Sequence, residues 1–439
     1  MKKKRRAVFA AIICGMILFL HPAAAKGTEE CYQALLEKGF PEDYAASLAP
    51  LARAHPSWHF EALFVTEISR AEGAAYDFAF CLEHETELPR RSLVPAGAKS
   101  LAAGDAAFDS GLAPASREAV AFFLDPRNFL CEEGIFQFWD LSGGGGDEND
   151  AAALFRGSVL EEIRIGGKSL AAFLCEEGEK AGVNAVFLAD RLRQEQGKSG
   201  NALITGTGGD TLCRWKKEGT DYENGKRVLT PKEAPEEAEL TALNGYYNFF
   251  NIGANGNGAF EITRRGLARA CREGWDSPEK AVAGGIAYLK EEYLARYQNT
   301  LYLQKWNVDA RSKTAEGFSR NFWGQYMQNI LAPSLEGKRL GAALAQTDGA
   351  FSFLIPVYEN MPASPSPDPS GGEYTFQREI FAPGKENESA PEKSAPEKSA
   401  SSPEKAAFPL ALGLGAAFFS ALFLCFFSLA LSRSALLKK

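Results

Sequence analysis

Hydrophobic residues recur at helical spacing in five stretches of the middle of the chain, which predicts five helices. Asn184 is a suitable N-cap for the third helix, and Gly197 is placed to end it. Ser277 followed by Pro278 is a typical start for the fifth helix. The five stretches are 151–165, 169–181, 184–196, 259–275 and 277–297.

Two stretches between these helices are rich in glycine, asparagine and aromatic residues, as turns and short strands are. They are LITGTGGD (203–210) and NGYYNFFNIGANGNG (244–258). The region before residue 142 is less periodic. We therefore expect a predominantly helical α+β head, with an N-terminal subdomain over 26–142 and a second domain over 143–361.

Glu195 stands out because of its place on the third predicted helix. Leu188, Leu192 and Glu195 lie on one helical stripe, so a face that packs in the core ends in a carboxylate. Partial burial and the negative end of the helix dipole both disfavour the anion. A carboxyl that stays protonated near neutral pH can act as a general acid, and the flanking Gln194 and Gln196 could orient it or a sugar hydroxyl.

The alternative is an exposed ion pair between Arg191 and Glu195, which are four residues apart. Such a pair contributes only about 0.3–0.5 kcal/mol, and this order of the two charges is the weaker one. The spacing alone leaves both interpretations open.

Both ends of the chain carry targeting signals. MKKKRR, an apolar run and the small residues Ala23 and Ala25 predict a signal peptide over 1–25, although an uncleaved anchor has the same outline. Residues 406–432 are apolar and uncharged, which predicts a single transmembrane helix. The basic tail, 433–439, favours a cytoplasmic C-terminus and an extracellular, cell-wall-facing head.

A segment rich in Pro, Ser, Glu and Lys, 362–405, separates the head from the predicted span and repeats SAPEK. Such a composition predicts a disordered linker. The net charge of −8 becomes −16 once the five basic residues of the signal region and the three of the tail are set aside. An acidic head argues against nucleic acid as a partner.

Six cysteines lie outside the two apolar ends, which permits three disulfides in 15 possible pairings, or buried free thiols. They form no C-x-x-C pair, the histidines are few, and Pro56 interrupts the pair His55 and His59, so no metal site is expected. No phosphate-binding loop, dinucleotide fingerprint or G-x-S-x-G motif is present, and we expect no cofactor. The six are Cys31, Cys81, Cys131, Cys175, Cys213 and Cys271.

Seven ordered stretches over residues 40–361 resemble the secreted endo-β-N-acetylglucosaminidases of Gram-positive bacteria, in the broad group of glycoside hydrolase family 73. They are FPEDYAASLAPLARAHPSWHF (40–60), DPRNFL with IFQFWDLS (125–142), LADRLRQEQG (188–197), GYYNFFNIGA (245–254), QNTLYLQKWNVD (298–309), FWGQYMQNILAPSLEG (322–337) and FLIPVYENMP (353–362). The segment 215–240 looks like an insertion relative to that family.

The resemblance implies a lysozyme-like fold and hydrolysis of the β-1,4 bond that follows N-acetylglucosamine in peptidoglycan. It implies that Glu195 is the catalytic acid. For substrate binding it implicates the aromatic stretch after that helix, and we add Gln194 beside the acid. The predicted contact residues are thus Gln194, Tyr246, Tyr247, Asn248, Phe249 and Asn251.

The second group of the reaction stays open. Asp210, Glu223 and Glu261 are candidate second carboxylates, and the 2-acetamido group of the substrate is the other possibility. Two other functions share these features: a lytic transglycosylase on the same fold, and a glycan-binding or scaffold head without catalysis.

Overall fold

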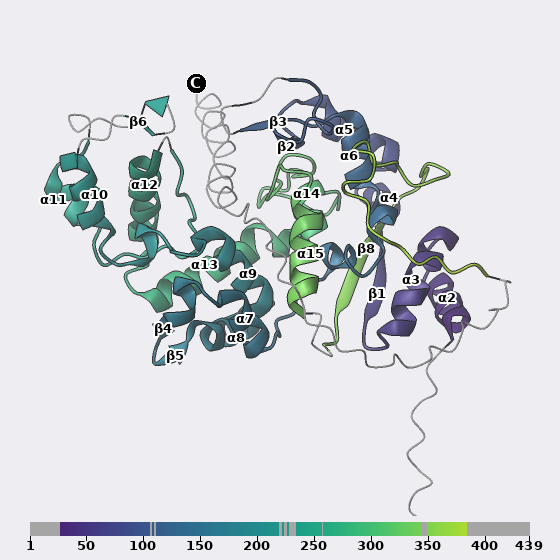
Figure 1. Cartoon of the computed structure of the whole chain (residues 1–439), viewed down its shortest axis with the longest axis horizontal. Coiled ribbons are helices and arrows are strands. Elements are labelled where there is room, and N and C mark those ends of the chain that lie inside the picture. Colours follow the sequence, from purple (N-terminus) through teal and green to yellow (C-terminus); the bar gives the residue numbers. More distant parts are fainter. Residues whose placement is uncertain are drawn as a thin grey trace, which may run out of the picture.

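A computed structural model describes residues 27–105, 108, 111–218, 222–223, 226–227, 234–256, 258–344 and 349–383 of the chain (Figure 1). The predicted signal peptide, the predicted span over 406–432 and the tail lie outside these residues. In the part that is described, no helix has both the length and the apolar character needed to cross a bilayer.

The described chain is predominantly helical with short strands, as the hydrophobic pattern predicts. Its helices are α2 (Thr28–Glu37), α3 (Glu42–Ala54), α4 (Val65–Ala71), α5 (Phe78–Glu87), α6 (Arg117–Leu124), α7 (Glu148–Phe155), α8 (Leu170–Ala181), α9 (Ala185–Gln196), α10 (Gly208–Glu218), α11 (Glu237–Thr241), α12 (Gly258–Glu273), α13 (Pro278–Glu292), α14 (Leu301–Trp306) and α15 (Ala332–Leu344). Its strands are β1 (His59–Phe64), β2 (Leu93–Pro95), β3 (Leu112–Pro114), β4 (Arg164–Ile165), β5 (Lys168–Ser169), β6 (Tyr222–Glu223), β7 (Lys226–Arg227) and β8 (Ser352–Val357).

The longest strand pair joins the two ends of the head. β1 and β8 run parallel with His59 opposite Ser352 and Phe64 opposite Val357. Their apolar side chains meet across the pair, where the rings of Phe60 and Phe353 stack at 5.5 Å. β1, which lies in the predicted N-terminal subdomain, therefore pairs with β8, which lies at the end of the predicted second domain.

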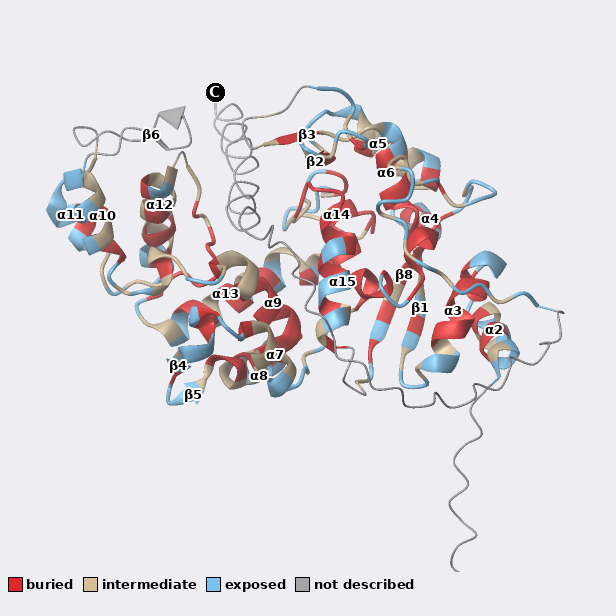
Figure 2. Cartoon of the chain, in the orientation of Figure 1, coloured by how far each residue is buried: buried red, intermediate tan, exposed pale blue. Residues whose placement is uncertain are grey.

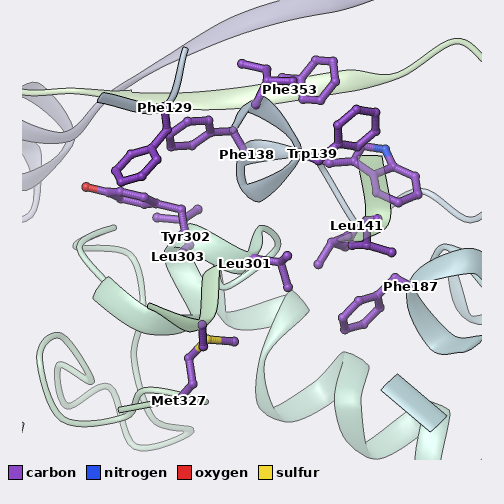
Figure 3. Packing of buried hydrophobic residues seen from close by; sticks show 14 of the residues in the cluster. Phe129, Phe138, Trp139, Leu141, Phe187, Leu301, Tyr302, Leu303, Met327 and Phe353 are labelled. Carbon is purple, nitrogen blue, oxygen red and sulfur yellow. The ribbon is translucent and has the colours of Figure 1, made fainter. Parts of the chain in front are cut away.

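One continuous hydrophobic core spans both predicted parts of the head and extends from Cys31 to Tyr358. Figure 2 shows the buried residues running from α2 and α3 through β1 and β8 to α9. In Figure 3, Phe353 of β8, Trp139 and Phe187 of α9 belong to the same packed cluster. The boundary at residue 142 therefore divides the sequence without dividing this core.

A smaller apolar cluster lies apart from the main core, between α10, α11 and α12. Its members are Leu203, Leu212, Leu240, Ala254, Phe260 and Leu267. The 244–256 segment follows α11 and is bonded to α12 through Asn248, whose Nδ2 donates to the carbonyl of Gly266. We expected turns and short strands there and at 203–210, but the described residues form turns and helix starts without a strand.

The predicted helix starts are confirmed where capping residues mark them. Asn184 Oδ1 accepts from the backbone N–H of Val186 at 2.9 Å, and Ser277 caps α13 with Pro278 in its first turn. The first predicted helix is wrong after Phe155, because Gly157 adopts a φ of +67° and a 3₁₀ turn follows.

Residues 362–383, which the composition assigned to the disordered linker, lie on the head instead. Tyr374, Phe376 and Phe381 pack against the main core, and the N–H of Phe381 donates to the carbonyl of Ala46 at 2.9 Å. The buried guanidinium of Arg127 donates to the carbonyl of Pro362 at 3.0 Å. We call 362–383 the strap; any linker to the membrane would begin after it.

The structure describes all six cysteines that lie outside the two apolar ends. Cys31, Cys81 and Cys131 are buried, Cys271 is exposed, and the six described cysteines form no disulfide with one another. Burial raises the pKa of the Cys81 and Cys131 thiols, which keeps them protonated.

The strap yields a stability prediction. Phe376 is partly buried, packs on Phe129 with ring centroids 6.0 Å apart, and lies under the ammonium of Lys338. We expect Phe376→Ala to lower the free energy of unfolding by about 1–2 kcal/mol, measured by urea denaturation.

Ile380 is the matched control, because it lies four residues further along the strap with 59% of its surface exposed. Ile380→Ala should change the free energy of unfolding by less than about 0.5 kcal/mol. Equal effects of the two substitutions would show that the strap does not dock as described.

Candidate active site

α9 holds Glu195 at its C-terminal end, at the margin of the main core. Leu188 and Leu192 are fully buried on the stripe that leads to it, as the spacing predicts. The helix ends at Gly197, as predicted, and this glycine adopts a φ of +59°. Glu195 is only partly buried, so its side chain lies at the margin of the core.

The Asn251 side chain holds the Glu195 carboxylate. Its Nδ2 donates to Oε2 of Glu195 at 3.0 Å and to the backbone carbonyl of the same residue at 2.9 Å. One amide group thus contacts both the end of the helix and the acid that the helix carries. This fixes the direction of the carboxyl relative to α9.

Two further hydrogen bonds hold the Asn251 amide in place. Its Oδ1 accepts from Gln196 Nε2 and from Asn201 Nδ2, each at 3.1 Å. Asn251 also adopts a φ of +51°, a conformation that asparagine tolerates better than most residues. The turn before it is tied by Asn248, whose Oδ1 accepts from the N–H of Ile252 at 2.9 Å.

Burial raises the pKa of Glu195 from 4.5 to about 7. The positive charge of Arg191 and the hydrogen bond from Asn251 act in the opposite direction, and the negative charge of Glu336 adds to the increase. Near neutral pH about half of the Glu195 side chains therefore carry a proton. That proportion suits a group that must give a proton and later take one back.

Arg191 does not form its ion pair with Glu195. Its guanidinium is buried and binds Glu336 Oε2 at 3.2 Å and Gln194 Oε1 at 2.9 Å. Its charge also lies over the ring of Tyr326, 4.5 Å from the centroid. The alternative of an exposed Arg191–Glu195 pair is therefore wrong.

No family model matches the chain. Among curated proteins, the bifunctional autolysin of Staphylococcus aureus is 30% identical to it over 126 residues, which is 29% of this chain and 8% of the autolysin. The chain resembles staphylococcal autolysins. The resemblance seen in the sequence motifs is thus confirmed over that stretch, although the chain spans only about 8% of the relatives it matches.

Solved structures give weaker likenesses to the same group of enzymes. S. aureus glucosaminidase B has 20% identity and a TM-score of 0.43, over 69% of this chain and 94% of that one. A catalytic mutant of S. aureus autolysin E, solved with the disaccharide NAG-NAM, has 18% identity and a TM-score of 0.39, over 64% and 97%.

Three of the predicted glycan-contact residues have side chains that a ligand could reach. Gln194 is partly buried, and its Nε2 donates to Asp190 at 2.9 Å. Tyr246 and Tyr247 are also partly exposed, and the Tyr246 hydroxyl hydrogen-bonds to Cys271, which raises the Tyr246 pKa. Gly206 leaves room for Tyr247, because a Cβ there would lie 2.4 Å from the tyrosine oxygen.

Asn248 and Phe249 are corrections, because both side chains are buried. Asn248 is fully enclosed, and its Nδ2 donates to the carbonyls of Ile252 at 2.8 Å and Gly266 at 3.0 Å. Phe249 is 1% exposed and stacks on Tyr247, and its carbonyl accepts from Gln196. These two residues support the Asn251 turn and do not offer a surface to a glycan.

Two of the three candidate second carboxylates have partners away from Glu195. Asp210 Oδ1 accepts from Asn244 Nδ2 at 2.8 Å on an exposed helix start, and Glu261 pairs with Arg265 on α12. Glu223 lies in β6, and its side chain is outside the described part of the structure. The carboxylate that acts electrostatically on Glu195 is Glu336, which sequence reasoning missed because it lies 141 positions further along the chain.

Within the described residues, no group of three or more His, Cys, Asp and Glu side chains could hold a metal ion. His55, half of the histidine pair weighed above, instead bonds to Glu132 at 2.8 Å and stacks on Trp58.

The raised pKa of Glu195 predicts a pH-dependent gain in stability for Glu195→Gln. Folding favours the protonated carboxyl, so the wild type loses stability as pH rises from about 4.5 through about 7. Glutamine cannot ionise and can still accept from Asn251. The variant should gain up to about 3 kcal/mol over the wild type between pH 4.5 and pH 8, measured by urea denaturation at both values.

Glu273→Gln is the control, because Glu273 also ends a helix but is exposed and pairs with Arg269 at 2.9 Å. It should show no such gain with pH. A constant difference between Glu195→Gln and the wild type at both pH values would contradict the burial of this carboxyl.

Proposed function

We propose that the head is a peptidoglycan hydrolase, an endo-β-N-acetylglucosaminidase that cleaves the β-1,4 bond after N-acetylglucosamine with Glu195 as general acid. The observation that carries the proposal is the Glu195 carboxyl, partly buried at the end of α9, held by Asn251 and with a pKa of about 7. The similarity to the S. aureus bifunctional autolysin supports the same class of substrate. A lysozyme-like arrangement of the head is part of this proposal.

The proposed reaction starts with proton transfer from Glu195 to the bridging glycosidic oxygen. As the bond to the departing sugar lengthens, positive charge develops at the anomeric carbon of N-acetylglucosamine. The hydrogen bond from Asn251 to Oε2 strengthens as the carboxylate forms, because a charged acceptor binds an N–H more strongly. Acid assistance contributes roughly 10²–10⁴ in rate, and positioning of the glycan supplies the rest.

Gln194, Tyr246 and Tyr247 are the proposed glycan contacts, because all three side chains stay partly exposed and offer amide and hydroxyl groups. We further propose that the head faces the cell wall from a membrane anchor, on the strength of the apolar segment 406–432 and its basic tail.

Two variants test the catalytic proposal. Whole protein is incubated with purified sacculi, and the products are analysed by mass spectrometry. The wild type should release glycans with N-acetylglucosamine at the reducing end, and Glu195→Gln should lose roughly 10³-fold or more in turnover while it still binds the glycan.

Glu273→Gln serves again as the matched control and should retain normal turnover. Anhydro-muramyl ends would instead identify a lytic transglycosylase. Glycan binding without any cleavage by the wild type would favour the scaffold function, and near-normal turnover of Glu195→Gln would discredit this assignment of the acid.

Asn251→Gly tests how much the amide contributes. Glycine accepts the positive φ of Asn251 but removes both hydrogen bonds to Glu195. We expect kcat to fall roughly 10–100-fold, because the acid loses its orientation. The alkaline limb of the pH–rate profile should also move to higher pH, since the lost hydrogen bond favoured the carboxylate.

Asn255→Gly is the control in the same segment, because Asn255 bonds to Arg265 and not to Glu195. It should leave both kcat and the pH profile close to those of the wild type. A fall in kcat with no movement of the alkaline limb would argue that Asn251 only stabilises the turn.

A further inference from the structure

Four charged side chains connect α9 with α15. Arg191 of α9 binds Glu336 of α15 at 3.2 Å. Asp190 of α9 binds Arg339 of α15 at 2.7 Å. Each pair joins one positive and one negative charge, so the four side chains together carry no net charge.

The two pairs differ in their access to water. The side chains of Arg191 and Glu336 are 3% and 4% exposed, whereas that of Arg339 is 48% exposed. Water can screen the charge of Arg339 but not that of Arg191. The Asp190 carboxylate is 2% exposed and also acts on Arg191, but it is already bound by Arg339. The carboxylate that pairs with Arg191 itself is Glu336.

Arg191 lies one helical turn before Glu195, and a cation in that position favours the carboxylate form of the acid. Gln194, Gln304 and the Tyr326 ring also contact its guanidinium, but none of them brings a full negative charge. Burial raises the pKa of Tyr326, which keeps its hydroxyl neutral. Glu336 is thus the carboxylate in direct contact with the guanidinium among the described residues.

The contacts of Glu336 indicate that its charge matters more than its packing. Its Oε2 faces Arg191, while its buried Oε1 has no hydrogen-bond partner among the described residues. A purely structural role would be served better by an apolar pair of similar volume, since burying two charges seldom adds stability.

We propose that Glu336 is a positioning residue that neutralises Arg191 and thereby keeps the proton on Glu195. The inference builds on the proposed role of Glu195 as general acid. It assigns a function to a carboxylate that contacts neither the acid nor, in the arrangement described, the glycan.

Glu336→Gln tests the inference, because glutamine keeps the shape and removes the charge. The titration of Glu195 is followed by NMR in the whole protein labelled at the glutamate carboxyl carbon, with the Glu195 signal assigned by its absence in Glu195→Gln. The midpoint should fall from about 7 by about one pH unit or more. The alkaline limb of kcat/KM should move down by the same amount, with about tenfold less activity above pH 8 and nearly normal activity at pH 5.

Two further variants separate charge balance from packing. Asp190→Asn also removes a buried carboxylate from the α9–α15 interface, but one that pairs with the half-exposed Arg339 and not with Arg191. It should leave the Glu195 midpoint within about 0.3 units, because water can screen the charge left on Arg339. Adding Arg191→Met to Glu336→Gln removes both charges and should return the midpoint to about 7.

An unchanged midpoint in Glu336→Gln would overturn the inference, and so would an equal shift in Asp190→Asn. The same would follow if the double variant failed to restore the midpoint while remaining folded by circular dichroism. These results do not depend on cleavage. Loss of the proposed function would appear separately, as turnover that survives Glu195→Gln.

Discussion

A single side-chain amide connects the end of α9 with the carboxyl that the helix carries, and much of the surrounding structure serves to place that amide. Asn251 reaches Glu195 because its turn adopts a positive φ and because Gln196 and Asn201 hold its oxygen. The buried Asn248 closes this turn by accepting a hydrogen bond from the N–H of Ile252. A shift of any of these residues would change the direction of the proton on Glu195.

Neighbouring charges act on the Glu195 carboxyl in opposite directions. Partial burial favours the neutral carboxyl, and Arg191 one turn away favours the anion. Glu336 approaches from a distant part of the chain and offsets Arg191. The outcome is a carboxyl with a pKa of about 7, which is near the value at which a group can both donate and recover a proton during turnover.

The strap shows how composition can misplace a boundary. Prolines, serines and charges after residue 361 predict disorder, yet Tyr374, Phe376 and Phe381 are spaced along that segment and pack on the head. Three aromatic residues suffice because Arg127 also binds the strap backbone. Near the end of the strap, the N–H of Phe381 donates to the carbonyl of Ala46.

Local sequence determined the helical class of the head, the start of α9 at Asn184, its stop at Gly197 and the stripe that ends in Glu195, because caps, glycines and spacing act within a few residues. Position at a helix end and a preceding arginine do not by themselves distinguish Glu195 from Glu273. Both residues end a helix, both follow an arginine by four positions, and Gly197 and Gly274 lie close behind.

Only the tertiary structure shows how the surroundings of the two glutamates differ. Arg269 stays paired with Glu273 near the surface, whereas Arg191 is drawn into the interior by Glu336 and Tyr326. Other contacts between distant segments pair β1 with β8 and bury Asn248 and Phe249. Such contacts depend on which segments meet in space, and that is set by the packing of the whole core.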